Sequence, residues 1–426
     1  MDITFHHYAI LAIAREAGFS PDEAKLVATY SQFVDDYTVK RPFPVTDVPD
    51  FARVLCSQKK ETLVLHPVTT GFSSWFDMAQ LGLEDEQKYI LTPFHFITAA
   101  RPDTEKREEL RVTPDHADSG SLLWGCMEQA RADCLQQAEG QVKSHAVLIR
   151  LGLLAHVFAD TYAHQGFSGS WGWENYCKLQ EVHDNNDGQD ISSRYHATAC
   201  HYFPGIGHTE AGYAPDDSHV TFSMALCCYK GDNYHLVKTR NNTETFLRCA
   251  HVLLNYFRSC LSRPPLAAFD AKWRELEDKL RQGLLAANLG QEGCRDFWQG
   301  KFKELTFHYD SKELLASLLA KDDDADTSSM NDIVDRLRDP ATADLLTTKL
   351  SVINDDFYYF NLAARDIRNM CAGEDVPNTL TPEQERQLAD YLRKPPVVRT
   401  RTEPPAQDAP ETNLSFVAKP LAIQEA

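Results

Sequence analysis

The sequence has no long apolar run and no leader of the kind that exported proteins carry. No stretch reaches the 18 or so apolar residues that suggest a membrane-spanning helix. The best candidate, 146–158, is interrupted by Arg150 and His156. The first residues contain no basic segment followed by an apolar one, which is the pattern of a secretory signal. We therefore expect a soluble protein with no transmembrane segment.

Paired cysteines and the common catalytic motifs are also missing. The chain has 11 cysteines, scattered and with no C-x-x-C pair, which indicates reduced core thiols and not a disulfide framework. Together with the missing leader, this pattern predicts a cytoplasmic protein. The chain contains no G-x-S-x-G, Walker A, dinucleotide-binding glycine pattern or H-E-x-x-H, so the enzyme classes that these motifs define are not favoured.

Positive charge is scarce. The chain has 43 Lys and Arg against 62 Asp and Glu, for a formal net charge of −19. Such a charge repels phosphate backbones and anionic membrane surfaces at long range, so nucleic acid is disfavoured as a stable partner, whereas a protein partner remains possible. The hydrophobic fraction of 43% is ample for a large core.

The strongest motif lies in the apolar segment 148–167, where His156, Asp160 and His164 follow one another at steps of four residues. On a helix each such step drifts by only about 40°, so the three side chains share one stripe. An ionised Asp in apolar surroundings is costly unless something compensates it. Imidazole and carboxylate are typical ligands of zinc, so the stripe predicts a metal site. A stripe that only hydrogen-bonds to itself is the alternative.

Further His and Asp residues could complete such a site. They stand at helix ends, between aromatic residues or after glycines, where an unpaired polar side chain is unfavourable or the backbone can approach a ligand closely. The candidates are His6, Asp35, His95 and His208, with Glu210 or Asp216. Each of them could instead be structural. Arg240 could bind an anionic group of a substrate and Trp171 could wall a pocket.

Helical periodicity dominates the chain outside 166–243, which is irregular and rich in Gly, His, Asp and aromatic residues. We predict helices over 2–18, 20–34, 121–141, 148–164, 243–261 and 265–287, further ones near 295–320 and 329–371, one more within 377–392, and a short strand at 62–65. The predicted fold is all-α, a large helical domain with long irregular loops. We expect a metal-binding helical core domain at 1–262, a C-terminal helical region packed on it at 263–393, and a disordered Pro- and Glu-rich tail at 394–426.

Five segments together resemble a bacterial family of unknown function: the start Asp2-x-x-Phe5-His6-x-Tyr8, then 31–36, 93–96, 156–167 and 207–216. More remotely, the order of these residues is similar to that of the metal ligands in the zinc-dependent phospholipase C and P1 nuclease superfamily. That resemblance implies an all-α fold with up to three zinc ions. It places ligand roles on His6, Asp35, His95, His156 and Asp160.

The sequence departs from the superfamily at three points. His164 follows Asp160 sooner than the next ligand usually does, a spacing closer to that of related fungal incompatibility domains. The usual final H-x3-E pair is replaced by His208 with Glu210 or Asp216. The secreted enzymes use a processed N-terminal residue as a ligand, and here Met1 or the Asp2 carboxylate could take that place. The resemblance covers about residues 1–255.

The hypothesis is a metal-dependent hydrolase of phosphoester bonds that binds one to three ions, with zinc as the expected metal. Asp160 or Asp35 would both ligate and orient the attacking water. The expected substrate is a phospholipid head group or a small phosphodiester. The alternatives are a non-catalytic helical binding protein stapled by a metal, and a toxin- or effector-like interaction module.

Overall fold

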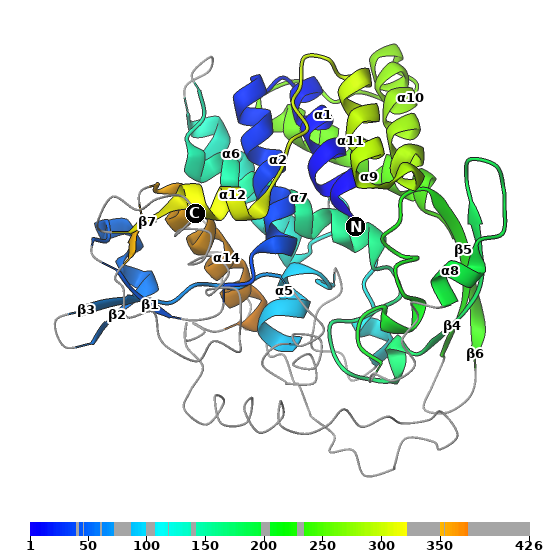
Figure 1. Cartoon of the computed structure of the whole chain (residues 1–426), viewed down its shortest axis with the longest axis horizontal. Coiled ribbons are helices and arrows are strands. Elements are labelled where there is room, and N and C mark those ends of the chain that lie inside the picture. The colour runs from blue at the N-terminus through cyan, green and yellow to red at the C-terminus, as the bar shows by residue number, and fades with distance from the viewer. Residues whose placement is uncertain are drawn as a thin grey trace, which may run out of the picture.

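Helix α7 (His145–Ala163) runs through the middle of the protein (Figure 1). The computed structural model describes residues 1–39, 42–45, 47–59, 62–71, 87–98, 107–117, 119–137, 142–196, 205–227, 234–321, 350–352 and 354–373. From Leu151 to Ala163 every residue of α7 is buried. Its length and composition would also suit a membrane span, but 83% of that apolar window is buried inside the protein. A helix that is apolar all round and surrounded by protein is typical of a core.

Four helices pack around α7: α2 (Pro21–Asp36), α6 (Leu122–Gln136), α9 (Asn242–Cys260) and α14 (Asp356–Ala372). Helix α1 (Ile10–Ala17) packs on α2 and α9. Helix α2 starts with a capping box between Ser20 and Glu23, which satisfies two of its free N-terminal donors. It approaches α7 closely at Gly152, where a Cβ atom would lie 2.4 Å from the carbonyl oxygen of Val27. A glycine is therefore needed at this crossing, which brings the C-terminal end of α2 towards the middle of α7.

The C-terminal helices share the same hydrophobic core. They are α10 (Ala271–Leu285), α11 (Gly290–Lys301) and α12 (Ser311–Leu318). Buried side chains of these helices, such as Trp273 and Trp298, belong to one cluster with those of α1, α2 and α7. The ring of Trp298 lies 6.0 Å from that of Tyr8, near the N-terminus. Helices α10, α11 and α12 are thus in direct contact with the core.

Two β-sheets lie at opposite ends of the molecule, with the helices between them (Figure 1). One has the strand order β2-β3-β1-β8-β7, formed by Cys56–Lys59, Thr62–Leu65, Phe43–Val45, Leu350–Val352 and Leu319–Lys321. The other is antiparallel, with the order β4-β5-β6, formed by Cys177–Asp184, Val220–Cys227 and Tyr234–Asn241. The fold is therefore mixed α and β.

The all-α prediction is wrong. The strand predicted at 62–65 is confirmed as β3, but the other strands were not predicted. Strands β4 to β6 lie in the segment that the composition suggested was irregular. The other sheet pairs β1 with β8, whose residues are far apart in the chain, and local periodicity carries no record of such pairing.

Short helical segments connect these elements: η1 (Thr4–Ala9), η2 (Asp50–Leu55), η3 (Gln87–Leu91), α5 (Thr92–Phe94), η4 (Arg107–Leu110), η5 (Trp173–Asn175), α8 (Ser192–His196), η6 (Thr209–Ala211) and η7 (Ala286–Leu289). The predicted helices at 2–18, 20–34, 121–141, 148–164, 243–261 and 265–287 are present, although the first begins as the π-helix η1. The helix within 377–392, the tail at 394–426 and most of 329–371 lie outside the described residues.

Candidate metal centre

The carboxylate of Asp160 lies at the centre of a cluster of nitrogen atoms. Its Oδ1 is 2.8 Å from the α-amino nitrogen of Met1 and 3.1 Å from Nε2 of His6. Its Oδ2 is 3.2 Å from Nδ1 of His95 and 3.3 Å from Nε2 of His156. The side chain is only 2% exposed, so these groups take the place of water around a buried charge.

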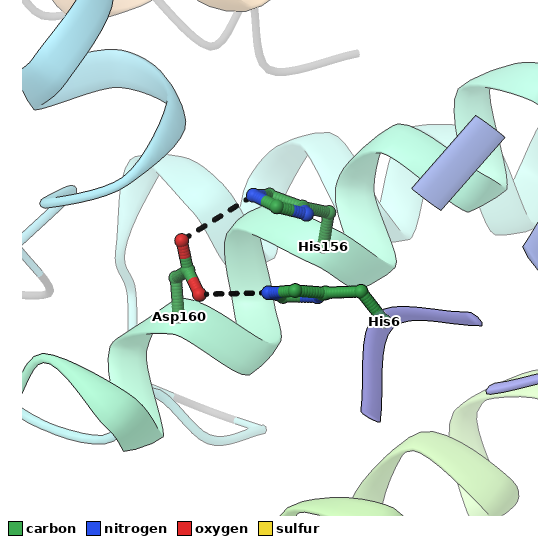
Figure 2. Close-up of side chains that lie close together, drawn as sticks. All are labelled: His6, His156 and Asp160. Atoms are coloured by element: carbon green, nitrogen blue, oxygen red, sulfur yellow. Dashed lines mark hydrogen bonds and ion pairs between the residues drawn. The ribbon is translucent and has the colours of Figure 1, made fainter. Parts of the chain in front are cut away.

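His6, His156 and Asp160 form what we call the inner group (Figure 2). Helix α7 supplies His156 and Asp160, one turn apart, and the π-helix η1 supplies His6. The rings of His6 and His156 are stacked 3.8 Å apart, and Figure 2 shows both pointing at the carboxylate of Asp160, which lies beside the stack. π-helical turns are rare and frequent at functional sites, and here one carries His6 into the core.

Asp35, His95 and His156 form the middle group. Oδ1 of Asp35, at the end of α2, is 3.7 Å from both Nδ1 of His95 and Nε2 of His156. His95 follows α5, and its Nε2 lies 2.7 Å from the carbonyl oxygen of Thr70. A carbonyl can only accept, so this nitrogen carries the proton. In the neutral ring, Nδ1 then offers its lone pair to the group.

His164, His208 and Asp216 form the outer group. Nε2 of His164 is 3.1 Å from Oδ1 of Asp216, and Nε2 of His208 is 3.3 Å from Oδ2. The Nδ1 atoms of both rings donate to backbone carbonyls, those of His95 at 2.6 Å and Gly212 at 2.9 Å. This is how metal-binding histidines are commonly oriented.

The outer group shows most directly that a cation fits. Burial lowers the pKa of His208 despite the nearby Asp216. In the neutral ring, which this shift favours, Nδ1 carries the proton and the lone pair of Nε2 faces a carboxylate oxygen. Two acceptors repel each other at this distance unless a positive charge lies between them. The ligand atoms of each of the three groups lie within 4.8 Å of one another, so the protein contains His and Asp groups that could hold metal ions.

The electrostatics of the inner group also favour an ionised carboxylate. Burial alone would raise the pKa of Asp160, but His164 and the amino group of Met1 hold it well below its usual range. Burial and the other basic groups lower the pKa of His156 to about 4, despite the attraction of Asp160. Burial would lower the pKa of the Met1 amine, but Asp160 and other carboxylates raise it to about 11. A charged carboxylate beside neutral imidazoles is a suitable ligand set for a divalent cation.

The structure brings all of the predicted ligands together: His6, Asp35, His95, His156, Asp160, His164 and His208. His164 lies at the C-cap of α7, just beyond the regular helix. Of the two acids proposed to accompany His208, Asp216 joins the group, whereas Glu210 accepts a hydrogen bond from the backbone of Cys177. At the N-terminus the amine of Met1 lies in the cluster, while the Asp2 carboxylate accepts from the backbone N–H of Thr4 at the start of η1.

The two residues predicted to bind substrate have other partners. The half-buried guanidinium of Arg240 donates to the carbonyls of Tyr162, Ala163 and Pro215. It thereby joins the end of α7 to the segment that carries Asp216. The side chain of Trp171 is 46% exposed, and its backbone N–H donates to Gln87. A role in substrate binding stays a prediction for both.

Sequence reasoning missed Thr70, whose backbone carbonyl holds the ring of His95. No sequence pattern could have predicted this role, because every residue type has a backbone carbonyl.

The fold and the site define a mixed α and β protein with interlocking His and Asp groups that could hold metal ions. The sequence matches the model of a family of unknown function, DUF6765, over residues 1–374, so the chain belongs to this family. No curated protein and no solved structure matches it. The expected membership of a family of unknown function is thus confirmed, whereas these comparisons do not support the remote resemblance to the phospholipase C and P1 nuclease superfamily.

Proposed function

We propose that this protein is a metal-dependent hydrolase of phosphoester bonds. The observation that carries the proposal is that the three ligand groups interlock around Asp160. The inner and middle groups share His156, and Oδ2 of Asp160 is also 3.6 Å from Nδ1 of His164 in the outer group. Neighbouring cation sites of this kind are typical of enzymes that cleave phosphoesters.

Zinc is the metal we propose, with up to three ions. The donors are imidazole nitrogens and carboxylate oxygens, with no thiolate in the three groups. Zinc accepts this combination readily, whereas magnesium and calcium prefer oxygen ligands alone. The α-amino group of Met1, 2.8 Å from Asp160, is a further donor if it loses its proton.

When bound, such cations polarise phosphoryl oxygens and lower the pKa of a water molecule at the site. The exposure of each ligand residue to solvent suggests its role. Asp160, 2% exposed, holds the groups together, whereas Asp35, 31% exposed, can reach a solvent molecule and orient it. Asp216 and His208, each 20% exposed, lie on the accessible side. We assign substrate binding to that side.

The substrate we propose is a small phosphodiester or a phospholipid head group. The net charge of −19 opposes a long polyanion, while the cations would supply local positive charge for one phosphate. The resemblance to the phospholipase C and P1 nuclease superfamily supports this choice through the order of the ligands alone. It does not extend to the fold, which contains two sheets.

The test combines elemental analysis of the purified protein with hydrolysis of bis(p-nitrophenyl) phosphate and of short-chain phosphatidylcholine. We expect two to three zinc ions per chain, and turnover that chelation abolishes and zinc restores. Asp35→Asn should reduce turnover strongly, whereas His308→Ala, which changes an exposed histidine, should not. Bound metal with no turnover would favour the alternative, a binding protein that a metal stabilises. A protein that binds no metal contradicts both.

A further inference from the structure

We propose that Thr70 is a positioning residue that sets the geometry of the middle group by holding His95 and the end of α2 at the same time. The inference rests on the proposed metal binding and concerns how that site is built. Thr70 has no ligand atom in any of the three groups.

Thr70 and Gly71 are bonded to the end of α2. The hydroxyl of Thr70 donates to the carbonyl of Val34 at 2.7 Å, and the backbone N–H groups of Thr70 and Gly71 both donate to the carbonyl of Tyr37 at 3.1 Å. The last carbonyls of a helix have no partner within the helix. These bonds therefore satisfy the end of α2 and anchor it on both sides of Asp35.

Gly71 packs tightly against the backbone of Asp35. A Cβ atom on Gly71 would lie 1.9 Å from the backbone oxygen of Asp35. The side chain of Thr70 is fully buried, so water cannot replace its hydrogen bond to Val34. The position of the Asp35 backbone thus depends on the segment 70–71.

The same residue orients His95. The Thr70 carbonyl accepts from Nε2 of His95 at 2.7 Å, which turns Nδ1 towards Asp160, 3.2 Å away, and Asp35, 3.7 Å away. Carbonyl partners of this kind fix the ring and proton of metal-binding histidines. Asp35 and His95 come from distant parts of the chain. Thr70 bonds directly to the ring of His95 and, through the carbonyl of Val34, to the helix end that carries Asp35.

Thr70→Val tests the proposal, because it removes the hydroxyl and keeps the shape and the carbonyl. Thr69→Val is the matched control, since the Thr69 hydroxyl is also buried and donates to a carbonyl, that of Val39, but supports neither ligand. Thr70→Ser, which keeps the hydroxyl, is the conservative variant. Metal-free protein is titrated with zinc against a chromophoric chelator, and with Co²⁺ to record the visible spectrum. Near-ultraviolet circular dichroism checks the fold of each variant.

We expect Thr70→Val to weaken one zinc site about 10- to 100-fold, the usual effect of losing an outer support, and to change one component of the Co²⁺ spectrum. Thr70→Ser should bind as the unchanged protein does, and so should Thr69→Val. Unchanged zinc binding by Thr70→Val, or an equal loss in Thr69→Val or in Thr70→Ser, would overturn the proposal. If Thr70→Val does not fold, Thr70→Ala, which also removes the hydroxyl, is measured in its place. Zinc binding without hydrolysis would refute the proposed enzyme and leave this inference intact, whereas a chain that binds no zinc overturns both.

Discussion

The inner and outer groups use the same residue types but are built differently. In the inner group His6 and His156 are stacked and fully buried, and among the described residues their Nδ1 atoms have no hydrogen-bond partner. In the outer group the Nδ1 atoms of His164 and His208 donate to backbone carbonyls, and His208 is 20% exposed. The outer rings are stacked as well, 4.9 Å apart, so the difference lies at Nδ1. Backbone carbonyls orient the outer rings, whereas the inner rings are held by packing and by the contacts of their Nε2 atoms with Asp160. We infer that an inner ion exchanges slowly and that an outer ion exchanges readily and faces the substrate.

The largest effect is expected from Asp160→Asn, which should disrupt the inner and middle groups together. The substitution removes the charge next to the Met1 amine, His6, His95 and His156. Breaking a buried ion pair from one side typically costs 3–5 kcal/mol, so we expect the free energy of unfolding to fall by about that amount. Elemental analysis should show loss of the inner and middle ions, and the hydrolysis assay should show no turnover. A variant that keeps its full metal content would show that Asp160 is not the shared centre.

Asp216→Asn should separate the groups. Asp216 lies between His164 and His208 and is a ligand of the outer group alone, although its Oδ1 also lies 3.3 Å from the amine of Met1. We expect one ion fewer per chain, with the inner ion retained and released more slowly to EDTA than the outer ion of the unchanged protein. Glu210→Gln is the control, because Glu210 accepts from the backbone of Cys177, and its metal content should not change. Loss of all ions in Asp216→Asn would contradict two independent groups.

Much of the inner group could be predicted from the sequence because its spacing is local. His156 and Asp160 share a helical stripe whatever the rest of the fold does, and the apolar residues around them identify the stripe as buried. Pairing His6 and His95 with that stripe depended on their apolar surroundings and on the resemblance. Even so, the sequence could not show that the His6 helix would be a π-helix or that Glu210 would turn away from His208.

The sheets could not be predicted for a different reason. In β5 the buried residues Val220, Phe222 and Met224 alternate as in a strand, but the surrounding glycines and histidines obscured this signal. In the other sheet, Val45 pairs with Leu350, and only the folded helices between them bring these residues together. Thr70 is a third case, since its carbonyl acts on His95 and a carbonyl leaves no mark in the sequence.

Gly152→Ala should have a smaller effect, confined to the middle group. A Cβ atom at this position would lie 2.4 Å from the carbonyl oxygen of Val27, so α2 must move away from α7 and carry Asp35 with it. Overpacking of this kind costs about 1–3 kcal/mol. We expect a loss of about 2 kcal/mol in the free energy of unfolding from urea titration, together with weaker binding of the ion nearest Asp35.

Gly125→Ala is the matched control for that substitution. Gly125 is also inside a helix, α6, but nothing lies within 4 Å of a Cβ atom built there. Alanine is the better helix former by up to about 1 kcal/mol, so this variant should be as stable as the unchanged protein or more so. Equal destabilisation by the two substitutions would show that the crossing at Gly152 is not the cause.

The smallest effect concerns how η1, the π-helix that carries His6, responds to acid. His7, next to His6 in η1, is fully buried, and both of its ring nitrogens lack a hydrogen-bond partner within the described part of the chain. Burial lowers its pKa from 6.5 to about 3. Below pH 6.5, His7 therefore binds a proton in the unfolded chain but not in the folded protein. The free energy of unfolding thus falls as the pH falls.

His7→Phe should remove this part of the acid sensitivity. Between pH 7 and pH 5.5, the unchanged protein should lose about 1.3 kcal/mol more of its free energy of unfolding than the variant does. Urea titrations in EDTA at the two pH values measure the difference without interference from metal binding. His308→Gln is the control, because His308 is 60% exposed. Its free energy of unfolding should fall by as much as that of the unchanged protein. If His7→Phe loses as much stability as the control, the ring of His7 takes up a proton in the folded protein, and burial does not keep it neutral.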